Sequence, residues 1–356
     1  MPETSEKNCW PDPRARVAWL DLAKAVSAFA VVMTHVASIG WQALEPIDAA
    51  WLPTSVYEIA TRFAVPVFFM VTGALILNPR RSVGMRRLWG SDIARTAAIA
   101  LLVSAAFSAL ERLLFGWTGW RSLISETLDG PYFIWYLWVL AGIYALTPAL
   151  RVVARDRCLL GYTLVLLAVF VLGQSTAQAM APGSWVATWL GNFILFSTGA
   201  EGVFYCLLGA WLVSWRPSRR ASVVLMAAGA LALVVAVALN YASARTVGPD
   251  LYYVSRSNLL IALFSVGAFE GFRLVGPCLG DGRRLRDLAA VGLAVYLIHP
   301  FLRLVMEGVP LFAPVVRVLL EAPVVAVPLV SLVLWALSLG LACARGACAS
   351  LFRRVR

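Results

Sequence analysis

Residues 17–40 read VAWLDLAKAVSAFAVVMTHVASIG, and this long apolar run decides the fold class. About 20 apolar residues are enough for a helix to cross the hydrocarbon core of a bilayer. Similar windows follow at roughly 55–77, 92–114, 131–150, 158–178, 192–214, 222–243, 256–275, 287–306 and 322–344. The sequence therefore predicts an all-α, polytopic integral membrane protein with about ten transmembrane helices.

The composition agrees with a protein whose outer surface faces lipid. Of the 356 residues, 61% are hydrophobic and only 14% are charged, whereas soluble domains carry about 25% charged residues. The net charge of +11 would suggest nucleic-acid binding in a soluble protein. Here we interpret it as the charge of cytoplasmic loops, and we expect no nucleic-acid partner.

The basic residues alternate along the chain in step with the ten windows. One set of connections, flanks and adjoining helix ends holds 22 arginines and lysines and the alternate set holds 7, with Lys24 left out of both sets. Because cytoplasmic loops are enriched in basic residues, this pattern predicts that both termini lie in the cytoplasm. We expect an N-terminal tail at 1–16, a transmembrane domain at 17–345 and a basic C-terminal tail at 346–356.

Three ionisable residues in the first window predict a polar face on a membrane helix. At 100° per residue, His35 falls within about 20° of Lys24, and Asp21 lies one turn before Lys24. Asp21 can therefore pair with Lys24. The alternative for Lys24 is that it extends its ammonium group to the membrane surface, but the shared face favours a lined cavity.

The only two histidines, His35 and His299, both lie inside apolar windows. Ionisable residues inside a membrane usually face the interior of the helix bundle and serve function. Histidine is also the side chain best suited to proton transfer near neutral pH. The alternative is a histidine that only ties two helices together, and for His299 a kink at Pro300 is a further structural explanation.

Four segments together resemble a known family. Lys24 and His35 have the spacing of its first-helix motif, and three further stretches follow in family order: FAVPVFFMVTGALIL (63–77), FIWYLWVLAGIYALTPALR (133–151) and VYLIHPFLRL (295–304). With these features the chain resembles the membrane acyltransferase-3 family of bacterial O-acyltransferases. It is most similar to the stand-alone branch that includes the enterobacterial-common-antigen O-acetyltransferase. Lysine stands at position 24 where the family usually has arginine.

The resemblance implies transfer of an acyl group, typically acetyl from acetyl-CoA, to a hydroxyl of a cell-envelope saccharide or lipid-linked glycan. It also implies a multi-pass protein of the bacterial inner membrane, with acyl-CoA as a co-substrate and no permanently bound cofactor. His35 is the candidate general base, and Asp21 is expected to orient Lys24. Cations at the cytoplasmic mouth suit the phosphates of CoA; the candidates are Lys24, Arg80, Arg81, Arg86 and Arg87.

Other polar and aromatic residues are candidates for holding the acceptor. Arg62 can instead pair with Glu58 one turn away, and the aromatic residues can instead anchor the helices at the membrane interface. The acceptor candidates are His299, Glu201, Arg62, Trp135, Tyr136 and Arg256.

Two other classes of function remain open at this stage. Polar residues in membrane helices and a basic face also suit a secondary transporter of a small polar solute, although we find no inverted repeat. The second alternative is a non-catalytic member of the same fold, which the lysine at position 24 favours. Neither histidine nor any cysteine has metal-ligand spacing, so we expect no metal site.

Overall fold

The computed structural model describes residues 10, 17–116, 119–191, 199–279 and 282–354. Within these ranges the regular elements are all helical, which confirms the predicted all-α class. Shorter 3₁₀ and π segments, among them η4 (Leu251–Val254), join or extend the α-helices. The α-helices are α1 (Ala18–Ala43), α2 (Trp51–Ala60), α3 (Ala64–Ile76), α4 (Met85–Arg87), α5 (Ala94–Phe115), α6 (Trp120–Asp129), α7 (Trp135–Arg155), α8 (Arg157–Leu167), α9 (Gln174–Met180), α10 (Trp185–Gly191), α11 (Ala200–Trp215), α12 (Arg219–Val247), α13 (Leu259–Val275), α14 (Arg283–Gly308), α15 (Ala313–Glu321) and α16 (Pro323–Arg354).

The helices account for all ten apolar windows of the sequence. Among the described residues, nine helical segments are long and apolar enough to cross a membrane. One of them, Trp51–Ile76, consists of α2 and α3 in succession. The remaining window, 192–214, corresponds to α11, which is apolar but shorter; residues 192–198, which precede α11 in that window, lie outside the described ranges. The protein is therefore a polytopic membrane protein.

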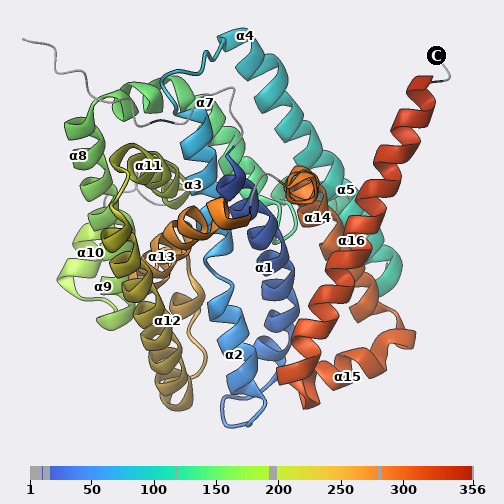
Figure 1. Cartoon of the computed structure of the whole chain (residues 1–356). Helices are drawn as coiled ribbons and strands as arrows, with labels where there is room; N and C mark the ends of the chain where they lie inside the picture. Colours follow the sequence, from blue (N-terminus) through green and yellow to red (C-terminus); the bar gives the residue numbers. More distant parts are fainter. Residues whose placement is uncertain (1–9, 11–16, 117–118, 192–198, 280–281, 355–356) are drawn as a thin grey trace, which may run out of the picture.

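The helices run between two ends of the bundle (Figure 1). α4 and the C-terminal end of α16 lie at one end, at the top of the view, whereas α15 and the connection from α1 to α2 lie at the other. The arginine-rich connection of residues 80–87 therefore shares its end with the C-terminus of α16. α16 continues through residues 346–354, which we expected to belong to a C-terminal tail. Most of the expected N-terminal tail, residues 1–9 and 11–16, lies outside the described ranges.

α1 lies at the centre of the fold, where it contacts α2, α3, α13, α14, α15 and α16. Its small residues Ala23, Ala28 and Ala37 are almost fully buried, which lets neighbouring helices approach closely. Because α1 is enclosed in this way, the ionisable residues on it face protein and cavities rather than lipid.

α3 and α11 cross in close contact through two glycines. A Cβ atom on Gly73 would collide with the backbone carbonyl of Cys206, and one on Gly209 would collide with the backbone of Met70. Helices in membranes associate largely through such close packing of small residues. This contact fixes the position of α3 beside α11.

Candidate functional site

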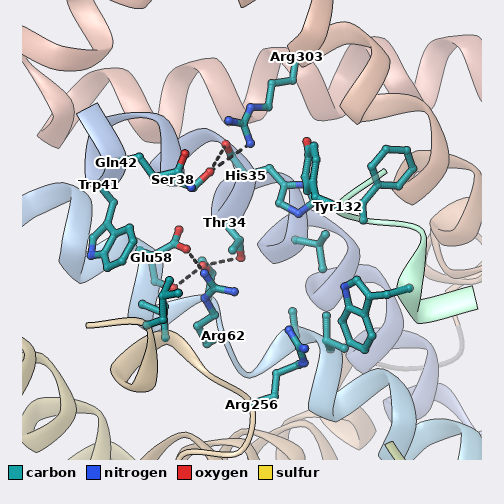
Figure 2. A pocket seen from close by; sticks show the side chains of 18 of the residues that line it. Thr34, His35, Ser38, Trp41, Gln42, Glu58, Arg62, Tyr132, Arg256 and Arg303 are labelled. Atoms are coloured by element: carbon teal, nitrogen blue, oxygen red, sulfur yellow. Dashed lines mark hydrogen bonds and ion pairs between the residues drawn. The ribbon is translucent and has the colours of Figure 1, made fainter. Parts of the chain in front are cut away.

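A polar cavity of about 400 Å³ opens beside the second half of α1 (Figure 2). His35 lies in its wall, so we call it the His35 cavity. Its walls come from α1, from the junction of α2 and α3, from residues 132–135, from the segment around η4 and from α14. These elements are far apart in sequence, and only the packing of the bundle around α1 brings them together.

The two histidines form a hydrogen-bonded pair at the wall of this cavity. Nδ1 of His35 lies 2.7 Å from Nε2 of His299, and the two rings stack with their centroids 4.9 Å apart. Nδ1 of His299 lies 2.9 Å from the carbonyl oxygen of Val295, one turn earlier on α14. His299 is 1% exposed and lies behind His35, whereas His35 itself lines the cavity.

The hydrogen bonds of the pair fix the positions of its protons when both rings are neutral. A carbonyl oxygen only accepts, so Nδ1 of His299 carries the proton that it donates to Val295. Nε2 of His299 is then the acceptor, and Nδ1 of His35 is the donor. This leaves the lone pair on Nε2 of His35, which is the arrangement that a general base at the cavity wall requires.

The junction of α2 and α3 interrupts a membrane-spanning segment at the cavity. Thr61, Arg62 and Phe63 form a turn, and Thr34 on α1 and Thr61 share a hydrogen bond of 2.7 Å across it. Arg62 pairs with Glu58, as the sequence predicted, and both residues line the cavity. Oε2 of Glu58 and Nε of Arg62 have no hydrogen-bond partner among the described residues. Interrupted helices at membrane depth are typical of cavities that hold polar ligands.

Arg256 enters the cavity from the segment between η4 and α13. Its guanidinium group lies 3.8 Å from the centroid of the Trp135 ring, and its Nε donates to Glu201 over 2.8 Å. The second carboxylate oxygen of Glu201 accepts a hydrogen bond from Ser257 over 2.8 Å. Glu201 is therefore not among the cavity-lining residues; it positions Arg256 from behind.

Arg303 covers the opposite side of the cavity (Figure 2). Its guanidinium group donates to Ser38 on α1 over 3.1 Å and to Glu307 over 2.8 Å. The same group lies 5.6 Å from the ring centroid of Tyr132, whose ring meets the His35 ring edge to face at 5.2 Å. Arg303 thus adds a third cation to the cavity wall, beside Arg62 and Arg256.

A second, smaller cavity of about 190 Å³ lies beside Lys24, and we call it the Lys24 cavity. Its walls come from α1, α3, α7 and α14, and they are mainly apolar. Lys24 donates to Asp21 over 3.1 Å, which confirms the expected pair. Lys24 and His35 lie on one side of α1 but line two different cavities. Tyr296 is a wall residue of both.

A third cavity of about 220 Å³ lies beneath the arginine-rich connection, and we call it the Arg81 cavity. Arg81 and Arg87 line it, and it shares Thr72, Leu75 and Tyr144 with the Lys24 cavity. Of the other donor-site candidates, Arg80 contacts the carbonyl of Trp10, and Arg86 is exposed on α4.

The position of Arg81 depends on Arg151, a residue at the end of α7. Arg151 is buried and donates to the carbonyls of Ile76, Pro79 and Arg81. These carbonyls follow the end of α3, where backbone acceptors lack partners within a helix. Arg151 therefore holds the chain between α3 and the basic connection in place.

The structure brings part of the candidate set together and separates the rest. His35, Arg62, Trp135 and Arg256 line the His35 cavity, whereas Tyr136 lines the Lys24 cavity, although it is adjacent to Trp135 in sequence. The site candidates did not include Tyr132, Tyr296, Arg303 or Glu58. The spacing of Tyr296, His299 and Arg303, three and four residues apart, is the signal that places them on one face of a helix.

These features define a multi-pass membrane protein with a buried pair of hydrogen-bonded histidines beside a polar cavity. The comparison with known families gives its class. The model of the acyltransferase-3 family, described as an acyltransferase domain, matches residues 17–344. The chain therefore belongs to this family of membrane acyltransferases. No curated protein and no solved structure matches it.

Proposed function

We propose that this chain is an O-acyltransferase of the bacterial inner membrane. It moves an acyl group, acetyl in the first instance, from acyl-CoA to a hydroxyl of a cell-envelope saccharide or lipid-linked glycan. The observation that supports this most is the His35–His299 pair, because its hydrogen bonds leave a basic nitrogen of His35 at the wall of a polar cavity.

The donor approaches from the end of the bundle that carries residues 80–87, the cytoplasmic end in the expected topology. Arg81 and Arg87 line the Arg81 cavity at that end, and their charges suit the phosphates of CoA. Lys24 follows in the next cavity, about 16 Å along α1 from His35 by the rise of the helix. We expect the extended pantetheine arm of CoA to run along these two cavities, which share wall residues.

The acceptor occupies the His35 cavity in this scheme. Its walls offer aromatic rings, three guanidinium groups and the carboxylate of Glu58, a set that suits the hydroxyl groups and ring faces of a saccharide. Among these rings, that of Trp135 already lies against the guanidinium group of Arg256.

In the transfer step, Nε2 of His35 removes the proton from the acceptor hydroxyl as its oxygen attacks the thioester carbonyl. The carbon–oxygen bond forms, and the carbon–sulfur bond then breaks. The proton on Nε2 passes to the leaving sulfur, which gives the ester and free CoA. His299 acts through His35: it accepts from Nδ1, keeps the His35 ring in the productive tautomer and shares the charge when His35 is protonated.

The test is release of free CoA from acetyl-CoA by purified protein in detergent, with and without a bacterial envelope glycan fraction. We expect the glycans to stimulate release by the unaltered protein. We expect His35→Ala to reduce stimulated release about 10²- to 10⁴-fold, the range that general base catalysis contributes. Thr163→Ala, on the exposed side of α8, is the matched control and should retain full activity.

Two outcomes would contradict the proposal. One is stimulated CoA release by folded His35→Ala at the unaltered rate, which removes His35 from the mechanism. The other is no release by unaltered, folded protein with any glycan fraction, which would favour a transporter or a non-catalytic member of the fold.

A further inference from the structure

Tyr296 separates the two cavities that the proposed reaction must connect. It lines both the His35 cavity and the Lys24 cavity, and it is 5% exposed. Its hydroxyl group donates to the carbonyl oxygen of Phe133, which lies across the bundle ahead of α7. Its ring lies 5.4 Å from that of Tyr136 and 6.2 Å from that of His299, between centroids. Tyr296 therefore forms a wall directly beside the histidine pair.

The Lys24 cavity suits an uncharged, partly apolar ligand group rather than a phosphate. Phe68, Val71, Leu75, Leu140 and Leu293 contribute its apolar walls. The ammonium group of Lys24 is already bonded to Asp21, so its charge is offset by a carboxylate. Phosphates bind best where several charged donors converge, and the Arg81 cavity offers two arginines, Arg81 and Arg87, with Asp92 also in its wall.

The backbone of α14 is weakened at the residue that forms the wall. Pro300 lies within α14 and has no N–H group to donate to the carbonyl of Tyr296, four residues earlier. A helix with a missing hydrogen bond bends there more easily than an intact one. A bend of α14 at this point would move Tyr296 and open the wall between the two cavities.

We propose that the Lys24 cavity is the slot for the thioester end of acyl-CoA and that Tyr296 selects for a short acyl group. The acyl group is the tip of the donor, so it is the first part to meet Tyr296 on the way to His35. A two-carbon group passes with a small rotation of the ring, whereas a longer chain meets the wall. This inference rests on the proposed function and adds to it the class of donor that the site accepts.

The experiment compares acetyl-, propionyl-, butyryl- and hexanoyl-CoA as donors, by CoA release at fixed glycan concentration. The variants are Tyr296→Leu, which shortens the wall, and Tyr296→Phe, which removes only the hydroxyl bonded to Phe133. Tyr162→Leu, on the exposed side of α8, is the matched control, because it makes the same replacement at a residue outside the walls of all three cavities. Thermal unfolding in detergent shows whether each variant is folded.

We expect kcat/KM for butyryl-CoA relative to acetyl-CoA to rise about tenfold or more in Tyr296→Leu, the scale on which a pocket discriminates a methylene group. In Tyr296→Phe the ratio should rise less, and in Tyr162→Leu it should stay within about twofold. If the ratio is unchanged in folded Tyr296→Leu while acetyl-CoA is still used, the selection by Tyr296 is wrong. Equal rises in Tyr296→Leu and Tyr162→Leu would also overturn it. Because acetyl-CoA turnover by the unaltered protein is measured in parallel, failure of the proposed function itself is seen separately.

Discussion

The His35 cavity and the Lys24 cavity lie on the same side of one helix, yet they are built from opposite chemistry. The His35 cavity has three arginines, a buried carboxylate and the histidine that carries a free basic nitrogen. The Lys24 cavity has apolar walls and one cation that is already paired. Tyr296 alone belongs to both of these sets of wall residues.

In the proposed reaction, the two cavities along α1 therefore serve different steps. A polar cavity with unmatched hydrogen-bonding groups suits a polar substrate and the proton transfer, whereas an apolar slot suits positioning of a thioester. In a membrane enzyme this separation lets the donor and the acceptor bind in different cavities and approach each other from different sides. Variants in the two cavities should therefore change different kinetic constants.

After His35 itself, the largest effect should come from His299, which lies outside both cavities and is hydrogen-bonded to His35. We expect His299→Ala to lower kcat about a hundredfold, since His35 loses the acceptor that fixes its tautomer. His299→Gln should recover most of that loss, because its amide oxygen can accept from Nδ1 of His35. A role in packing alone predicts equal kcat for the two variants, and that result would contradict the positioning role.

Lys24 should affect the donor alone. We expect Lys24→Ala to raise KM for acetyl-CoA about tenfold, the loss of one hydrogen bond to a charged group, with no change in glycan dependence. Lys24→Arg should be tolerated because it retains the charge. Initial rates across a range of acetyl-CoA concentrations measure this, and an unchanged KM in Lys24→Ala would remove Lys24 from the donor site.

Glu58, in contrast to Lys24, should affect the dependence on the acceptor alone. Glu58 lines the His35 cavity, and its Oε2 is buried without a partner among the described residues, so we propose a hydroxyl of the acceptor as its partner. We expect Glu58→Gln to raise the glycan concentration for half-maximal CoA release about fivefold, with KM for acetyl-CoA unchanged. If only the acetyl-CoA dependence changes, Glu58 does not hold the acceptor.

Arg151 should give the smallest effect on turnover, because it supports the entrance rather than either of the two compared cavities. Arg151→Gln leaves backbone carbonyls after α3 short of donors, at a cost of about 1–3 kcal/mol. We expect a lower unfolding temperature in detergent and a small rise in KM for acetyl-CoA. A stable variant with normal KM would show that the connection holds its position without Arg151.

The fold was predictable from the sequence because apolar length is a strong signal in a membrane protein. Each of the ten windows corresponds to a helical segment, and the pair of Glu58 with Arg62 follows from their spacing of one turn. The interruption between α2 and α3 was not predicted, because Glu58 and Arg62 are spaced as a pair on one continuous helix and the turn at Thr61–Phe63 contains neither glycine nor proline.

The site was predictable only along single helices. Spacing placed Lys24 and His35 on one side of α1, but it carried no information on the wall that Tyr296 inserts between their cavities. Likewise, both histidines were identified one by one, whereas their contact joins residues 264 positions apart and depends on how α1 packs on α14. Glu201 looked like an acceptor ligand from sequence, and only the fold shows that Arg256 and Ser257 occupy its oxygens.

The most direct test of the account compares His35→Ala with Lys24→Ala in CoA release as acetyl-CoA is raised to saturation at fixed glycan concentration. The account predicts that saturating acetyl-CoA restores Lys24→Ala to near the unaltered rate, since only donor binding is impaired. It predicts that His35→Ala stays about 10²- to 10⁴-fold slower at every donor concentration, because the base is missing. If saturating acetyl-CoA restores the rate of both folded variants, or of neither, then the assignment of proton transfer to the His35 cavity and of donor binding to the Lys24 cavity is wrong.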